Sequence, residues 1–96
     1  MIMETAYISV VPGREEEFLA TLPTAIKILE SAHGYRGIHI HRGVERNSTI
    51  MLAIAWNELA DHTEGFRQSP LFGQWRALIS PFFAENPQVE HWELLN

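Results

Sequence analysis

The stretch Thr49-Ile50-Met51-Leu52-Ala53-Ile54-Ala55-Trp56 decides the fold. Its residues are apolar almost without interruption, and a short run of this kind between polar segments is typical of a β-strand. Successive side chains of a strand point to opposite faces of the sheet, so both faces of this strand are apolar. A strand of this composition must be covered on both sides.

Three other segments complete a sheet around this strand. Residues 35–42 have strand character, and the polar turn at residues 43–48 is short enough to join them to the central strand as an antiparallel hairpin. Residues 2–11 predict another strand, which Pro12-Gly13 ends, and residues 88–95 predict the last strand.

Helical spacing of apolar residues marks a first helix over residues 14–32. Its buried stripe consists of Phe18, Leu22, Ile26 and Leu29. Pro23 should kink this helix, and Gly34 favours a left-handed stop after it.

The second helical region is predicted in two parts. Asn57 can cap a short helix over residues 58–66, whose apolar face carries Leu59, His62 and Phe66. Ser69-Pro70 is a typical start of the next helix, which should end near Ser80.

This order of elements, β-α-β-β-α-β, predicts an α+β, ferredoxin-like antiparallel sheet with the helices on one face. The opposite face is not polar, although water would meet it in a monomer. Face-to-face pairing of two copies would cover that face, so we predict a homodimer forming a dimeric α+β barrel. A monomer that exposes a few small side chains, such as Ala53 and Ala55, is the alternative.

Length and composition restrict the function. A chain of 96 residues predicts one domain over residues 1–96, and the absence of cysteine excludes disulfides, thiolate metal sites and thiol nucleophiles. A formal net charge of −5 argues against nucleic acid as a partner. No apolar stretch is long enough to cross a membrane, and the first residues do not resemble a signal peptide, so a cytoplasmic location is expected.

His62 is the most informative candidate for chemistry. It lies between Leu59 and Phe66 on the apolar stripe of the short helix and should therefore point inward. A buried neutral imidazole can act as a base near neutral pH. The alternative is a core histidine bonded to a backbone carbonyl.

Several other side chains are candidates for a binding pocket. Trp56 can form the flat wall of an aromatic pocket or pack in the core, and Arg67 can attract an anionic substrate or pair with a carboxylate. Tyr7 and Trp75 can line the pocket or belong to the core. Asn57 can orient a substrate oxygen, although helix capping explains it more simply.

Signatures of cofactor binding are missing from the sequence. His39 and His41 share a strand face, but spacing places no third metal ligand beside them. Cross-strand polar packing, or lining of the space between two sheets, is expected instead. There is no glycine-rich phosphate loop and no dinucleotide fingerprint. Carboxylates cluster in the first helical turn and in loops, and no buried acid–base pair is expected. An enzyme with this sequence would work without nucleotide or flavin, and no metal ligand set is expected.

The sequence resembles the antibiotic biosynthesis monooxygenase family of the dimeric α+β barrel superfamily. The resemblance extends over nearly the whole chain, and its most specific part is His62-Thr63-Glu64-Gly65-Phe66-Arg67-Gln68-Ser69-Pro70-Leu71-Phe72. It also includes residues 11–18, 34–37, 55–56, 81–83 and 89–91.

This resemblance implies a homodimer whose sheets face each other and, in characterised members, oxygenases without cofactor that act on quinols and anthrones. In such members a base removes a substrate proton and the electron-rich anion reacts with dioxygen. The tryptophan matching Trp56 belongs to their pocket. Some anthrone oxygenases carry an asparagine shortly before that tryptophan, where this chain has Leu52 and Ala53. The haem-degrading branch is disfavoured, because Ala6, Phe66 and Arg76 occupy the positions of its Asn, Trp and His.

The sequence thus suggests a dimeric, cofactor-independent monooxygenase acting with dioxygen on a small electron-rich aromatic such as a quinol. In this hypothesis Trp56 and Phe66 line the pocket, His62 assists proton removal and Arg67 steers a substrate oxygen. A non-catalytic ligand-binding module and an isomerase-type proton-transfer enzyme on the same scaffold are the alternatives.

Overall fold

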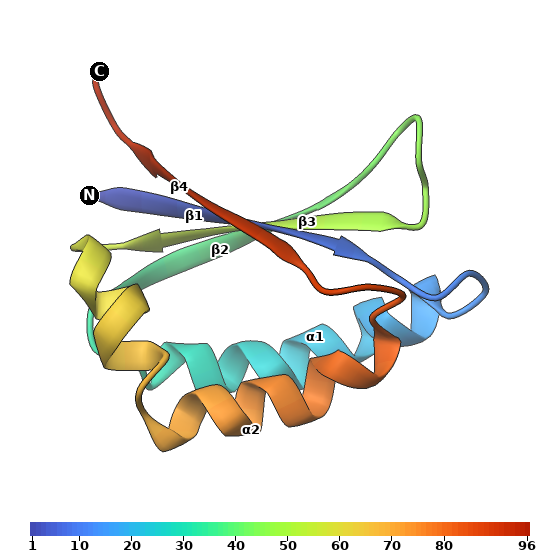
Figure 1. The fold of residues 1–96 in the computed structure, drawn as a ribbon, viewed down its shortest axis with the longest axis horizontal. Coiled ribbons are helices and arrows are strands. Elements are labelled where there is room, and N and C mark those ends of the chain that lie inside the picture. Colours follow the sequence, from blue (N-terminus) through green and yellow to red (C-terminus); the bar gives the residue numbers. More distant parts are fainter.

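The computed structural model describes residues 1–96 and contains one four-stranded antiparallel sheet with helices on one face (Figure 1). The elements are β1 (Ile2–Ser9), α1 (Glu15–Glu30), β2 (Tyr35–Arg42), β3 (Thr49–Trp56), the π-helical turn η1 (Asp61–Phe66), α2 (Pro70–Ile79), the short 3₁₀ turn η2 (Ser80–Phe82) and β4 (Gln88–Glu93). The strand order is β2-β3-β1-β4, which confirms the predicted ferredoxin-like class.

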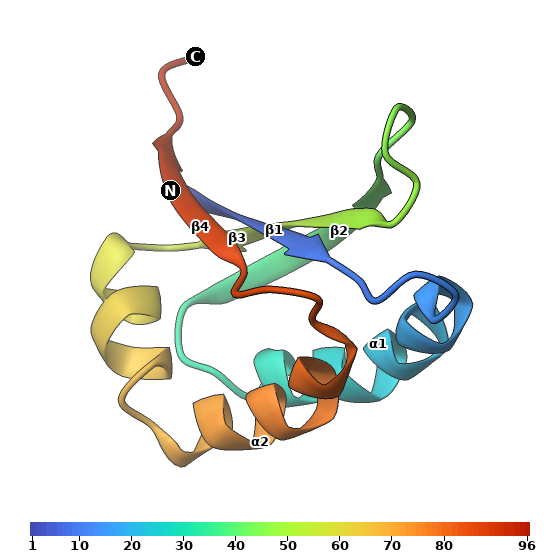
Figure 2. The same cartoon turned by 45° about the vertical axis from the view of Figure 1, so that its right-hand side comes forward.

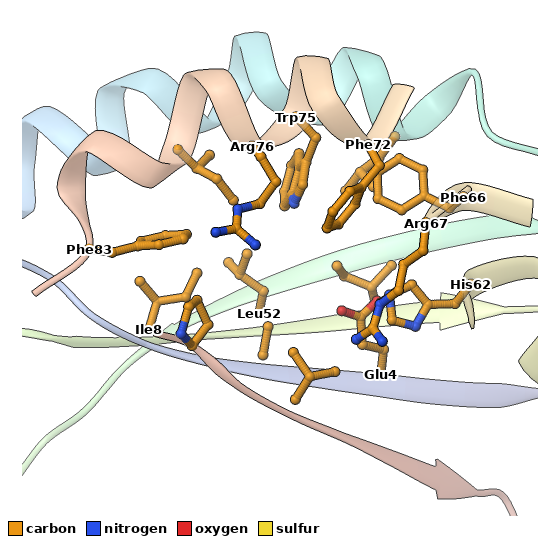
Figure 3. A pocket seen from close by; sticks show the side chains of 16 residues that line it. Glu4, Ile8, Leu52, His62, Phe66, Arg67, Phe72, Trp75, Arg76 and Phe83 are labelled. Atoms are coloured by element: carbon orange, nitrogen blue, oxygen red, sulfur yellow. The ribbon is translucent and has the colours of Figure 1, made fainter. Parts of the chain in front are cut away.

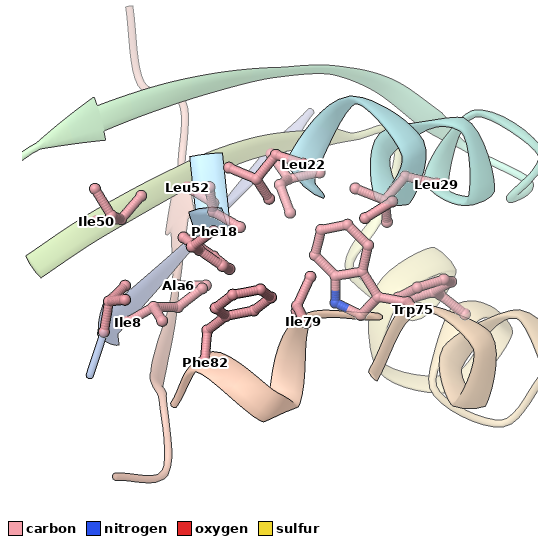
Figure 4. Packing of buried hydrophobic residues seen from close by; sticks show 14 of the residues in the cluster. Ala6, Ile8, Phe18, Leu22, Leu29, Ile50, Leu52, Trp75, Ile79 and Phe82 are labelled. Atoms are coloured by element: carbon pink, nitrogen blue, oxygen red, sulfur yellow. The ribbon is translucent and has the colours of Figure 1, made fainter. Parts of the chain in front are cut away.

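Helices α1 and α2 lie side by side under the sheet, and η1 closes one end of the space between the layers (Figure 2). The core fills this space with side chains from both layers, as Figure 4 shows for Leu22 and Leu29 of α1, Leu52 of β3 and Trp75 of α2. Leu22 and Leu29 are fully buried, so the helical stripe read from the sequence faces the sheet. Neither helix is long and apolar enough to span a lipid bilayer.

The strand register determines which side chains lie side by side at one end of the sheet. Glu4 in β1 lies opposite Ile54 in β3 and opposite His91 in β4. Trp56 lies two residues beyond Ile54 on the same strand and therefore faces the same side of the sheet. The side chains of Glu4, Trp56 and His91 thus meet at one end of the helix-covered face.

The other face of the sheet has no helix over it (Figure 2). Thr5 and Ala53 are buried there, whereas Met3 and Trp92 are 43% and 49% exposed. The indole N–H of Trp92 on β4 donates a hydrogen bond to the hydroxyl of Thr5 on β1 at 2.7 Å. The Trp92 ring therefore lies against β1, and the apolar surface continues from β1 onto β4. The apolar reverse face predicted from β3 is present in the monomer.

The ends of two strands differ from the sequence prediction. β1 ends at Ser9 because the next residues leave the regular ladder: Val10 N–H donates to Ser48 O and Val11 N–H donates to Phe82 O. β4 ends at Glu93 because its partner there, Ile2, is the first residue of β1.

The start of the short helix also differs. Asn57 does not cap it: its backbone N–H donates to Gly34 O at 2.8 Å, and the turn begins only at Asp61. The Asp61 carboxylate accepts the Glu58 N–H instead, at 3.0 Å. Leu59 was expected on the buried face but is 46% exposed. Helix α1 runs through Pro23, and Gly34 has the predicted left-handed conformation, with φ at 85°.

Replacing Leu22 with Ala should destabilise the protein by about 2–5 kcal/mol, because it removes a fully buried side chain at the helix–sheet contact and leaves a void. Urea denaturation monitored by tryptophan fluorescence measures the change. Val44, which is 91% exposed in the β2–β3 turn, gives the matched control. Equal effects of Leu22→Ala and Val44→Ala would contradict the packing described.

Candidate active site

A cavity of about 370 Å³ lies between the sheet and the helices, a size suited to a small organic molecule. Most of its wall is apolar, with aromatic side chains from η1, α2 and the segment after η2 (Figure 3). The ionisable side chains on the wall are Glu4, His62, Arg67 and Arg76. An apolar chamber with a few convergent polar groups is the usual form of a ligand-binding site.

Glu4 is a carboxyl group buried in this largely apolar wall. Only 6% of its surface is exposed, and its Oε1 accepts a hydrogen bond from the Trp56 indole at 3.0 Å. The His62 Nε2 lies 3.3 Å from the same oxygen. Burial raises the pKa of Glu4 above its usual value, although the Trp56 hydrogen bond and the charge of Arg67 act in the opposite direction.

His62 is 2% exposed, and its ring stacks on Trp56 with centroids 5.5 Å apart and an interplanar angle of 24°. Its Nδ1 lies 2.8 Å from Nε2 of His91 on β4. Burial, together with the charge of Arg67 and the neighbouring His91, lowers the pKa of His62 to about 4. The imidazole is therefore neutral at pH 7, and both of its nitrogens face side chains rather than a backbone carbonyl.

The π-helical geometry of η1 positions these side chains. The Arg67 N–H donates to His62 O at 3.1 Å, across five residues, which widens the turn relative to an α-helix. His62 and Phe66 both point inward from this turn and pack against Trp56. Arg67 follows directly and reaches the cavity beside Glu4 (Figure 3).

Arg76 brings a second positive charge to the cavity. Its guanidinium lies 5.4 Å from the ring centroid of Phe83 and 5.8 Å from that of Phe72. Its Nε is buried and has no hydrogen-bond partner. An unpartnered buried donor of this kind is costly, so the Arg76 side chain is held in place by its packing against the two rings rather than by a hydrogen bond at Nε.

The structure brings His62, Phe66, Arg67 and Trp75 together around one cavity. Trp56 lies behind them: it is fully buried and supports Glu4 and His62 without lining the cavity itself. Tyr7 alternates with the cavity-facing residues of β1 and lies against a separate, polar hollow. Tyr7 is therefore not part of this cavity.

Sequence reasoning missed three members of the site: Glu4, Arg76 and His91. The expectation that carboxylates would lie only in the first helical turn and in loops, with no buried acid–base pair, was wrong, because Glu4 occupies an inward position of β1 beside His62. Its alternation with Ala6 and Ile8 was the available indication, since all three face the same side of a strand. His39 and His41 lie on the exposed part of β2, away from the cavity.

Acid should destabilise the protein in part through His62. Its folded-state pKa of about 4 lies below the unfolded value of about 6.5, so between these pH values only the unfolded state takes up the proton. The free energy of unfolding is therefore not reduced by this group above pH 6.5. As the pH falls from 6.5 toward 4, uptake of the proton by the unfolded state lowers it by on the order of 2 kcal/mol.

Urea denaturation at pH 7 and at pH 4.5 tests the predicted effect of His62. The quantity compared between variants is the loss of unfolding free energy from pH 7 to pH 4.5. His62→Gln should lose less stability on acidification than the wild type, whereas His33→Gln, at an exposed loop position, should lose as much as the wild type. An identical loss in His62→Gln and wild type would show that His62 does not resist protonation.

Comparisons with known proteins agree with this architecture. A sequence model described as antibiotic biosynthesis monooxygenase matches residues 1–78. The uncharacterized protein YczJ of Bacillus subtilis (strain 168) is 33% identical over 93 residues, covering 97% of this chain and 98% of that protein.

Solved structures are also similar. A Bordetella bronchiseptica protein, provisionally named an antibiotic biosynthesis monooxygenase, is 38% identical with a TM-score of 0.95, covering 99% of this chain and 97% of the other. A Nitrosomonas europaea protein with the same provisional name shares the fold, with a TM-score of 0.80 at 17% identity and full coverage of both chains. The chain therefore belongs to the antibiotic biosynthesis monooxygenase family.

Proposed function

We propose that this protein is a cofactor-independent monooxygenase that oxidises a small electron-rich aromatic, of the quinol or anthrone type, with dioxygen. The observation that carries the proposal is a buried Glu4–His62 pair on the wall of an aromatic-lined cavity. Family membership supports a small-molecule function of this general kind. The identity of the residues and of the substrate class is our inference.

The cavity suits a flat, partly polar ring system. Phe66, Phe72 and Trp75 supply aromatic walls, and Arg67 lies at the same end as the Glu4–His62 pair (Figure 3). Removal of a hydroxyl or methylene proton leaves an aromatic anion, which the positive charge of Arg67 would stabilise. Trp56 acts indirectly in this proposal, because its indole N–H holds the carboxyl group in place.

The chemistry needs only a base and an oxidisable substrate. For an anthrone-type methylene, the pair takes one proton, and the carbanion transfers an electron to dioxygen and forms a carbon–oxygen bond to it. Cleavage of the O–O bond leaves a carbonyl on the substrate, and the second oxygen departs with two hydrogens as water. The substrate supplies all the electrons, so no reduced cofactor enters the balance.

Oxygen uptake with a panel of quinols and anthrones tests this function. Because His62 supports the base, His62→Ala should lower turnover of an accepted substrate by about 100-fold or more. His33→Gln is the control, since its side chain is exposed and outside the cavity. Absence of uptake across the panel would contradict the oxygenase proposal, and unchanged turnover in His62→Ala would remove His62 from the mechanism.

An isomerase-type proton transfer is the second candidate, and a specific observation favours it. The Glu4–His62 pair can remove and return a proton, and this chemistry needs no dioxygen. Product analysis under anaerobic conditions separates the two functions. Conversion of a substrate without oxygen would favour the isomerase.

We also propose that the helix-free face of the sheet pairs with a second copy. The supporting observation is the apolar hollow formed by Met3, Ala55, Trp92 and Leu95 on this part of the chain. Apolar surface left to water there would be unfavourable, and a second copy offers the same surface.

Sedimentation equilibrium should accordingly give twice the chain mass of 11.0 kDa. Met3→Glu should shift the protein toward monomer, because it places a charge in the contact, whereas Val44→Glu in the exposed turn should not. A wild-type particle of 11.0 kDa at working concentration would contradict the dimer.

A further inference from the structure

Glu4, His62 and His91 come from three different elements and form one continuous chain of titratable groups. The Glu4 Oε1 lies 3.3 Å from His62 Nε2, and His62 Nδ1 lies 2.8 Å from His91 Nε2. Glu4 and His62 line the cavity, whereas His91 lies on the edge strand β4 and is exposed to solvent. The chain therefore connects the cavity with bulk water.

The hydrogen-bonding capacity of each group decides which one faces a ligand. The Trp56 indole can only donate, so Glu4 Oε1 must accept from it. Both nitrogens of His62 are already within hydrogen-bond distance of Glu4 and His91. The second oxygen of Glu4, Oε2, has no protein partner and is not among the fully buried unpartnered atoms, so it borders the cavity. The free proton acceptor at the cavity wall is thus the carboxylate rather than the imidazole.

We infer that Glu4 is the proton-accepting residue of the cavity and that His62 and His91 form a relay that exchanges its proton with solvent. This goes beyond the assignment of the base to the Glu4–His62 pair, because it gives each member a separate task. Its part in turnover rests on the proposed function. The relay itself does not.

The relay has two end states that differ by one proton. In the first, a neutral Glu4 donates through Oε1 to His62 Nε2, His62 Nδ1–H donates to His91 Nε2, and His91 carries its own proton on Nδ1. To activate the base, His91 Nδ1–H passes to water, His62 Nδ1–H passes to His91, and the Glu4 proton passes to His62 Nε2. In the second state Glu4 is ionised and accepts N–H bonds from both His62 and Trp56. Each ring gains one proton and loses one, so both histidines stay neutral.

The surroundings favour this neutral transfer over an imidazolium intermediate. The charged group that acts on all three members of the chain is Arg67, which follows η1 and is positive. Arg76 on α2 adds a second positive charge farther along the cavity wall, beside Phe72 and Phe83. β3 contributes only the uncharged Trp56. Burial and Arg67 lower the pKa values of His62 and His91, so neither ring holds a second proton readily. A concerted shift of three protons avoids placing a second proton on either ring.

The structural test uses protein labelled with ¹⁵N at the histidine rings. Long-range NMR correlations distinguish the two neutral tautomers of each imidazole. As the pH is raised through the ionisation of Glu4, the proton of His62 should move from Nδ1 to Nε2 while the ring stays neutral. In Glu4→Gln the pH-dependent exchange of tautomer should disappear, and in His33→Gln it should persist. A His62 tautomer that stays constant while wild-type Glu4 titrates would overturn the relay.

The kinetic test uses any substrate that the panel identifies. Glu4→Gln should lower kcat by about 100-fold or more, because the amide cannot take the proton. His91→Ala should lower kcat by about tenfold with little change in KM, and added imidazole should restore part of it, because a soluble base can replace the missing relay member. Unchanged kcat in His91→Ala would overturn the relay in turnover.

The two tests separate the inference from the proposed function. A tautomer exchange without oxygen uptake would support the relay and contradict the oxygenase. Oxygen uptake with a constant His62 tautomer would support the oxygenase and contradict the relay.

Discussion

The hydrogen bond from the Trp56 indole to Glu4 holds a carboxyl group within a wall that is otherwise mostly apolar. Removing a carboxylate from water is costly, and the cost is tolerated only where donors or charges compensate. Here the compensation comes from one neutral donor, one imidazole and the nearby Arg67. The carboxyl group also fixes one side of His62, because one ring nitrogen lies 3.3 Å from Glu4 while the other lies 2.8 Å from His91.

The topology of the sheet makes this arrangement possible. Trp56 and Glu4 are 52 residues apart in sequence, yet the β1–β3 register places them on the same face at the same end of the sheet. His91 arrives from the opposite side because β4 pairs with β1 directly beside Glu4. The η1 turn then lays His62 over all three. Each partner comes from a different segment, so the site forms only when β1, β3 and β4 have paired and η1 has packed against them.

This dependence on long-range pairing explains which features could be predicted. Hydrophobic periodicity predicted the four strands, both helices and the inward direction of His62 and Phe66, because these follow from local spacing. Strand alternation also places Glu4 on the inward side of β1. The partners of a carboxylate at that position cannot be identified from sequence, because they depend on how β1 pairs with β3 and β4. Asn57 was misassigned because capping preference is local, whereas its backbone is held by Gly34 from a distant loop. Residue type leaves Tyr7 open between pocket and core, and strand alternation puts it on the other face of the sheet, away from the cavity.

The Oε1 of Glu4 and the Nε2 of His62 lie 3.3 Å apart, which is within the distance of an ion pair. The pKa of the carboxyl group is raised and that of the imidazole is lowered, and in both cases burial is the largest cause. Both shifts favour the neutral members over a carboxylate–imidazolium pair, because two desolvated charges cost more than their attraction returns. Arg67 adds to this by opposing a positive charge on the imidazole. Where both members are neutral, the pair changes its state by moving a proton, without creating a buried imidazolium. A ligand that fills the cavity excludes further water and strengthens the same preference, so binding and proton position are coupled through one buried oxygen.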